Sequence, residues 1–159
     1  MEIERKFLTQ TPLPSLKAGK KITQAYIFLM DQKEMRVRIC DEVSTLSIKI
    51  SLGDMSREDF EFSIPLTEAL KLIDIGSTHP PIEKMRYDIY YEGMKWEVDV
   101  FEETNKGLIL AEIELDSEGQ VFSKPPWVGE EVTFDKRYYN SYLYQTPYQQ
   151  WSGIKNELM

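Results

Sequence analysis

Short runs in which charged or polar residues alternate with apolar ones follow one another along most of the chain. Because successive side chains of a β-strand point to opposite faces, this alternation predicts strands with one apolar and one charged face. Turn residues separate the runs, which is typical of an antiparallel sheet. The clearest runs lie at residues 34–40, 45–50, 56–64, 83–90, 95–101 and 107–115.

The opening run MEIERKF alternates in the same way, with Glu2, Glu4 and Lys6 on one face and Ile3 and Phe7 on the other. On any single strand, such charges are most simply explained as a solvated face. Across the seven runs, however, basic residues gather on some strands and carboxylates on others, whereas solvated surfaces usually intersperse the two signs. The segregation favours a closed polar interior, and alternation alone leaves closure open.

Two stretches depart from strand periodicity. Residues 65–76 (PLTEALKLIDIG) have apolar residues at helical spacing, with Thr67 as a candidate N-cap and Gly76 as a stop, so we expect a helix. The aromatic tail from residue 135 to about 158 predicts helical segments packed on the sheet, interrupted at Pro147.

Length and composition favour one domain spanning residues 1–159, since 42% hydrophobic residues can form a substantial core. The sequence contains no apolar run of the roughly 18 residues needed for a transmembrane helix, and its charged start lacks the apolar segment of a signal peptide. We therefore expect a cytoplasmic protein. A net charge of −8 argues against nucleic-acid or membrane partners, but it leaves a basic pocket open.

Several common catalytic arrangements are missing from the sequence. Cys40 is the only cysteine, which excludes an internal disulfide and a cysteine-clustered zinc site. His79 is the only histidine, and its STHPP context predicts a turn. A phosphate-binding loop ending at Gly19 and Lys20 would need glycine at the position of Pro14. Any chemistry therefore has to run without an obvious imidazole base.

The charged faces of the predicted strands carry residues suited to a metal ion and a polyphosphate. Glu2 with Glu4, and Glu112 with Glu114, form pairs of hard oxygen ligands for Mg²⁺ or Mn²⁺, although solvated strand charges explain most such pairs. Arginine and lysine suit phosphate oxygens. The basic residues on these faces are Lys6, Arg36, Arg38, Lys49, Arg57, Lys84 and Arg86.

The start MEIERKFL, with its E-x-E-x-K spacing, resembles that of the CYTH family, also called triphosphate tunnel metalloenzymes. RVRI, LSIKI, SREDFEF, IEKMRY, WEVDVF, LAEIEL and PPWVGEEVTFDKRYYNSYL follow in the order typical of the family and cover nearly the whole chain. The chain looks closest to the short bacterial members. The resemblance implies an eight-stranded antiparallel β-barrel, closed into a tunnel with the charged faces inside and helices packed outside.

The resemblance also implies roles for individual residues. Tyr26 in QAYIF resembles a tyrosine that some family members pair with the lysine corresponding here to Lys84. Ala25 replaces the usual glycine, and a plain sheet aromatic explains Tyr26 equally well. Tyr26 and Lys84 form the expected catalytic group. Expected metal ligands are Glu2, Glu4, Glu112 and Glu114. Expected substrate-binding residues are Lys6, Arg36, Arg38, Lys49, Arg57, Arg86 and, from the tail, Lys136. Expected supporting acidic residues are Glu61, Glu97 and Asp99.

The expected activity is metal-dependent hydrolysis of a linear triphosphate, with inorganic tripolyphosphate preferred and nucleoside triphosphates as further substrates. Mg²⁺ or Mn²⁺ would be the cofactor and water the nucleophile. A class IV adenylyl cyclase, a thiamine triphosphatase and a non-catalytic polyphosphate-binding module remain alternatives. The sequence does not separate them. Three positions of the tail remain open: packed on its own core, capping one tunnel mouth, or contacting a second subunit in a homodimer.

Overall fold

The computed structural model describes residues 3–52 and 57–151 of the chain. These residues form one antiparallel sheet with a few helices, and every predicted run coincides with a strand. The strands are β1 (Ile3–Thr9), β2 (Lys20–Leu29), β3 (Lys33–Cys40), β4 (Val43–Ser51), β5 (Arg57–Ser63), β6 (Ile82–Tyr91), β7 (Met94–Phe101), β8 (Ile109–Leu115) and β9 (Val128–Glu131). The helices are α1 (Leu66–Gly76), α2 (Asn140–Gln145) and the 3₁₀ turns η1 (Glu103–Asn105) and η2 (Lys136–Tyr138).

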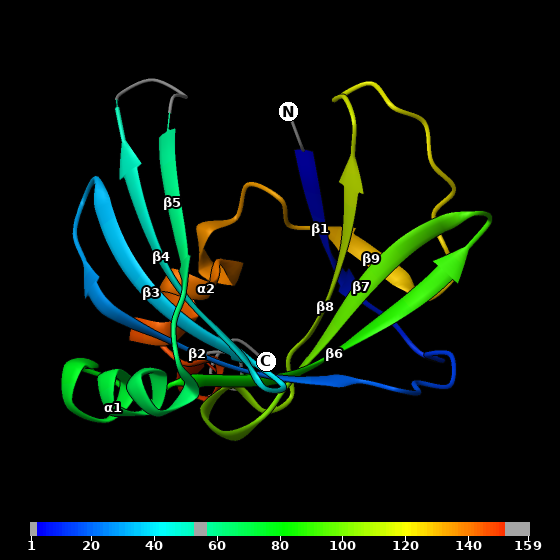
Figure 1. Cartoon of the computed structure of the whole chain (residues 1–159). Coiled ribbons are helices and arrows are strands. Elements are labelled where there is room, and N and C mark those ends of the chain that lie inside the picture. The colour runs from blue at the N-terminus through cyan, green and yellow to red at the C-terminus, as the bar shows by residue number, and fades with distance from the viewer. Residues whose placement is uncertain (1–2, 53–56, 152–159) are drawn as a thin grey trace.

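The sheet is open rather than closed. Its nine strands lie in the order β5-β4-β3-β2-β6-β7-β8-β1-β9, so that β5 and β9 are edges. β2 and β6 pair at the base of a deep curve, from which two arms of the sheet rise (Figure 1). The prediction of a closed eight-stranded barrel is therefore wrong. Alternation specifies the two faces of each strand, but it carries no information on whether the edge strands of a sheet meet.

Helix α1 covers the convex side of β2, β3 and β4, as predicted for helices packed outside (Figure 1). Val37 and Ile39 of β3 form a buried cluster with Ala69 of the helix. The predicted N-cap is wrong, because the helix begins at Leu66 with Pro65 at its N-cap and no side-chain cap. Proline suits a helix start, where its missing N–H would have had no intrahelical partner anyway.

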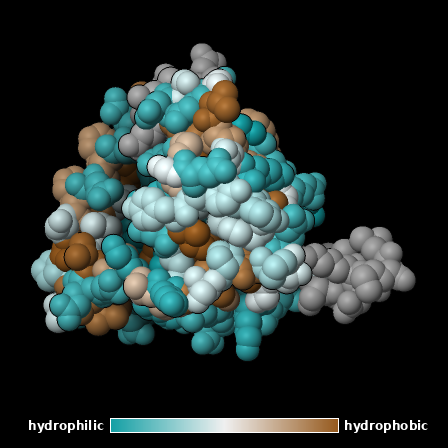
Figure 2. Space-filling model, turned by 90° about the vertical axis from the view of Figure 1, so that its right-hand side faces the viewer, coloured by the Kyte–Doolittle hydropathy of each residue, from teal (hydrophilic) through white to brown (hydrophobic). Residues whose placement is uncertain are grey.

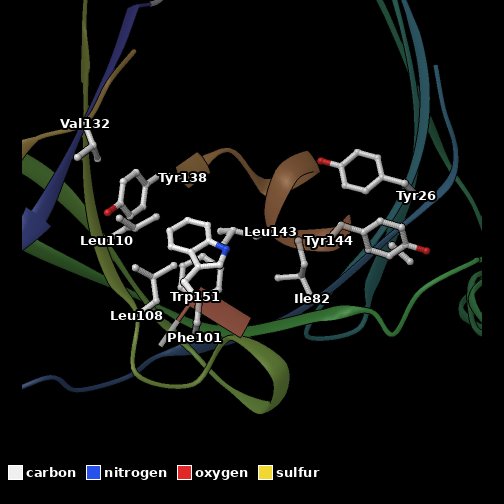
Figure 3. Close-up of a cluster of buried hydrophobic side chains, with 11 residues drawn as sticks. Tyr26, Ile82, Phe101, Leu108, Leu110, Val132, Tyr138, Leu143, Tyr144 and Trp151 are labelled. Carbon is white, nitrogen blue, oxygen red and sulfur yellow. The ribbon is translucent and has the colours of Figure 1, made fainter. Parts of the chain in front are cut away.

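Helix α2 lies between the two arms, on the concave side of the sheet, so the expectation that all helices pack outside is wrong for the tail (Figure 1). The tail is anchored there by Trp151, which lies in one buried cluster with Tyr138 (Figure 3). The ring centroid of Trp151 is 5.4 Å from that of Tyr138 and 5.3 Å from that of Tyr148. Helix α2 ends before Pro147, as predicted. The tail therefore fills space that a tunnel would have left open.

The convex side of the other arm is covered by irregular chain instead of a helix. Trp96 of β7 is fully buried among Phe7 of β1 and two aromatic residues, Phe122 and Trp127, from the segment after β8. Seen from this side, the surface is mainly hydrophilic (Figure 2).

In the described part of the chain, every helix is too short or too polar to cross a membrane.

Candidate active site

A cavity of about 480 Å³ lies on the concave side of the sheet, between the charged faces of the two arms and the start of α2. Eight of the residues predicted for the site line it. They are Glu4, Lys6, Tyr26, Arg36, Arg38, Lys49, Arg86 and Glu112. The cavity is thus built from β1, β2, β3, β4, β6 and β8, which are distant in sequence.

Strand register brings these side chains to one face. Directly opposed residues of an antiparallel pair point to the same side, and Lys6 of β1 lies opposite Glu112 of β8. On the other arm, Tyr26 of β2 lies opposite Arg36 of β3. The alternation seen in the sequence therefore becomes a polar concave surface once the strands pair.

The acidic side of the cavity is formed by Glu4 and Glu112, with the Nζ of Lys6 3.5 Å from the Oε1 of Glu112. Burial and the neighbouring charge of Glu112 raise the pKa of Glu4, against the opposing effect of Lys6. Two neighbouring carboxylates in one cavity suit a divalent cation, which would offset the repulsion between their charges. Glu114 lies opposite Glu4 in the register but is exposed, and Glu2 lies outside the described residues.

Behind the basic side of the cavity lies an ion-pair network. The Nζ of Lys84 is 2.8 Å from one carboxylate oxygen of Asp99, and Arg86 donates two hydrogen bonds of 2.7 and 2.9 Å to the same carboxylate. Lys84 is 0% exposed and Asp99 2%. Burial by itself would raise the pKa of Asp99, but Lys84 and Arg86 hold it well below its usual range. Asp99 is therefore ionised and fixes both basic groups.

The expected catalytic pair is divided between the cavity wall and the layer behind it. Tyr26 lines the cavity, and its hydroxyl lies 3.3 Å from the Nε2 of Gln24, whose Oε1 accepts a 2.8 Å hydrogen bond from Arg38. Burial raises the pKa of the Tyr26 phenol, and burial together with Arg36 lowers the pKa of Arg38 to about 10. Lys84 instead contacts Asp99 and the Oδ1 of Asn140, 3.2 Å away.

Other predicted residues lie outside the cavity lining. Glu61 is exposed on edge strand β5 and Lys136 is exposed in η2. Glu97, which lies opposite Glu112 in the register, has its Oε2 3.6 Å from the Nη1 of Arg86. Arg57 begins β5 opposite Ser51, and its side chain is outside the described part of the structure.

Sequence reasoning missed one side of the cavity, which comes from the chain after β9 and from β3. The missed lining residues are Glu34, Thr133, Phe134, Tyr139, Asn140 and Ser141. This tail segment reaches across the cavity, because Lys6 of β1 donates a 3.0 Å hydrogen bond to the carbonyl of Tyr138. The motif VTFDKRYYNSYL was a usable signal, since it carries most of these residues within the family resemblance.

Comparisons with known proteins point to one family. The family model for the CYTH domain matches residues 1–142. An inorganic triphosphatase from Acetivibrio thermocellus is 43% identical over 148 residues, covering 92% of this chain and 95% of its own. An inorganic triphosphatase from Nitrosomonas europaea is 36% identical over 146 residues, covering 89% and 95%. A crystal structure of an inorganic triphosphatase aligns with a TM-score of 0.74 at 34% identity, covering 92% and 95%.

Proposed function

The chain belongs to the CYTH domain family, and from this membership we propose that it hydrolyses inorganic triphosphate to pyrophosphate and phosphate. Two relatives that match it over nearly their whole length are inorganic triphosphatases. A proposal that rests on relatives alone would leave the site residues unassigned. The residues that line the cavity support candidates for these roles.

The observation that carries the proposal is the division of charge inside one cavity. Basic side chains from β3, β4 and β6 face the carboxylates of Glu4 and Glu112 across the concave surface. A linear triphosphate carries several negative charges, and arginine and lysine can neutralise the oxygens that do not react. The carboxylates would repel the same substrate unless a cation lay between them. The charge pattern therefore supports a metal-bound triphosphate.

CYTH triphosphatases are metal-dependent. Here Glu4 and Glu112 would hold Mg²⁺ or Mn²⁺, with Glu114 of β8 as a further ligand. Glu2, which lies outside the described residues, is the fourth ligand that the sequence predicts. When bound, such an ion stabilises the charge that develops on a reacting phosphoryl group and its leaving oxygen. Carboxylate oxygens suit both ions, so the donor set does not choose between them.

The remaining residues act by position and charge. Arg36, Arg38 and Lys49 on one arm and Arg86 on the other would bind the phosphate oxygens, and Lys6 would bridge the substrate and Glu112. Water is the nucleophile: its oxygen forms a bond to the terminal phosphorus, the bridging P–O bond breaks, and the water proton passes to solvent or to the released pyrophosphate. Tyr26 and Lys84 would influence the electric field at the reacting group. Tyr26 would act from the cavity lining, and Lys84 from its buried position beneath Asn140.

The test is product release from tripolyphosphate, ATP and thiamine triphosphate with Mg²⁺, with Mn²⁺ or with a chelator, followed by ion chromatography. We expect pyrophosphate and phosphate from tripolyphosphate only when a metal is present, and slower release from the two organic triphosphates. Cyclic AMP from ATP would replace the proposal with a cyclase. Faster hydrolysis of thiamine triphosphate would change the substrate, and binding without release would indicate a polyphosphate-binding module.

The proposal includes two further properties. The first is a cytoplasmic location, supported by a chain with a single cysteine and checked by cell fractionation. The second is a homodimer, for which the exposed apolar residues Phe60 and Phe62 on edge strand β5 are the best support. Light scattering coupled to size-exclusion chromatography would measure the mass, and a mass near 18.7 kDa at all concentrations would remove the dimer from the proposal.

A further inference from the structure

Asn140 is the first residue of α2 and connects the tail to the network behind the cavity wall. Its Oδ1 lies 3.2 Å from the Nζ of Lys84. Lys84 is fully buried and does not itself line the cavity, whereas Asn140 is half-buried and does. Asn140 therefore lies at the boundary between the buried lysine and the space proposed for substrate.

The chemistry of the two groups fixes the orientation of the carboxamide. An ammonium group has only donors, so the atom of Asn140 that faces Lys84 must be its carbonyl oxygen. The Nδ2 amide then points away from Lys84 and keeps two N–H donors for other acceptors. An asparagine oriented by a lysine in this way presents donors where an anionic substrate needs them.

The position of Asn140 is also fixed from the opposite arm. Two residues before Asn140, the backbone carbonyl of Tyr138 accepts a 3.0 Å hydrogen bond from the Nζ of Lys6 on β1. Tyr139 and Ser141, on either side of Asn140, line the same cavity. The tail segment is thus tied to β1 at one end and to β6 through Lys84, which limits how far Asn140 can move from the cavity.

We propose that Asn140 is a substrate-binding residue, which donates from Nδ2 to an oxygen of the bound triphosphate while its Oδ1 accepts from Lys84. This inference rests on the proposed function, because it takes the triphosphate as the ligand of the cavity. It extends the set of groups that bind the substrate from strand arginines and lysines to a neutral donor on the tail. It also gives Lys84 a way to act on the substrate without contacting it.

The deciding variant is Asn140→Asp, which keeps an oxygen facing Lys84 and replaces the two donors with a carboxylate oxygen. We expect the KM for tripolyphosphate to rise about 30-fold, because a lost donor and a new repulsion act on the same oxygen, at roughly 1.4 kcal/mol per tenfold change. Asn140→Ala, which removes the donors without adding a charge, should raise KM by about fivefold. The matched control is Gln145→Glu, an amide-to-carboxylate change at an exposed position of the same helix.

A role limited to positioning Lys84 predicts the opposite order. Asn140→Asp would then keep KM within twofold of the parent protein, while Asn140→Ala would lower kcat, and this result would overturn the inference. Thermal melting of both variants identifies any loss of fold. If Asn140→Asp does not fold, the KM of Asn140→Ala is the test: a rise of about fivefold supports the inference, and an unchanged KM overturns it. If Gln145→Glu raised KM as much as Asn140→Asp, the inference would also be overturned, because the rise would then come from added negative charge in general.

Binding measurements separate this inference from the proposed function. Calorimetric titration of the parent protein with tripolyphosphate, in the presence of chelator, reports binding without turnover. If the parent protein binds but does not hydrolyse, the proposed function fails and the Asn140 variants are compared by Kd instead of KM. If the parent protein hydrolyses and Asn140→Asp has the parent KM, only the inference fails. If the parent protein neither hydrolyses tripolyphosphate with metal nor binds it, with chelator or with metal, both fail.

Discussion

Lys84 and Asp99 form an ion pair on the concave face of the sheet, with 2.8 Å between Nζ and Oδ2 and both side chains shielded from solvent. The same carboxylate receives two hydrogen bonds from Arg86, which lines the cavity. Asp99 therefore supports the cavity wall without belonging to it. The stability of the protein and the geometry of its basic groups depend on one carboxylate.

Asp99→Asn should lower the free energy of unfolding by about 3 kcal/mol, because it leaves the buried charges of Lys84 and Arg86 without their counterion. Urea denaturation measures the change. The exposed Asp31→Asn is the matched control and should change the free energy of unfolding by less than about 0.5 kcal/mol. Equal effects of the two variants would show that the ion pair of Asp99 stabilises the fold no more than an exposed carboxylate does.

The same carboxylate predicts a pH dependence of stability. The pKa of Asp99 is lower in the folded protein than in the unfolded chain, so the folded state binds fewer protons and gains stability as pH rises through the unfolded value. This contribution is complete above about pH 5 and is lost progressively as pH falls below about 4. Melting temperatures measured from pH 6 to pH 2 should fall more steeply for the parent protein than for Asp99→Asn. Parallel curves would contradict the prediction.

Glu4→Gln should lower kcat about 100-fold while the protein stays folded, because it removes one charged oxygen ligand from the acidic side of the cavity. Steady-state hydrolysis of tripolyphosphate at several metal concentrations gives kcat and the metal requirement. Glu42→Gln, an exposed change in the turn after β3, serves as the control. A near-normal kcat in folded Glu4→Gln would remove Glu4 from the metal site.

Arg38→Ala should raise the KM for tripolyphosphate at least about tenfold, since a charge-assisted hydrogen bond contributes about 1.5 to 3 kcal/mol. The variant also frees Gln24, which Arg38 holds beside Tyr26. Arg137→Ala is the control, because Arg137 is exposed and paired with Asp135 away from the cavity. If both variants raise KM equally, the effect belongs to overall charge and not to the cavity.

Trp151→Ala should lower the free energy of unfolding by about 3 kcal/mol or more, as expected for a buried aromatic side chain that leaves a void. Trp151 packs against Tyr138 and Tyr142, which flank Asn140 in the tail, so the variant should also raise KM. Val121→Ala, at an 89% exposed position, is the control. Loss of stability with an unchanged KM would show that the tail holds its place in the cavity without Trp151.

The sequence by itself determined seven of the nine described strands and their two faces, all except β2 and β9. Alternation at 34–40 and 83–90, for example, predicted β3 and β6 with Arg36, Arg38 and Arg86 on the charged side, because a two-residue period is a local property of the strand. The family resemblance added the candidate residues, and eight of them line the cavity.

Only the tertiary structure decided how the strands and tail are arranged in space. The openness of the sheet, the position of α2 between the arms and the burial of Lys84 behind Asn140 all depend on contacts between distant segments. Such contacts produce no periodic pattern in the sequence. Whether two strand edges pair, or a tail packs against a sheet, depends on which distant surfaces are complementary and not on the local preference of each residue. The sequence therefore predicted the charged residues of a site, and folding decided which of them reach the cavity.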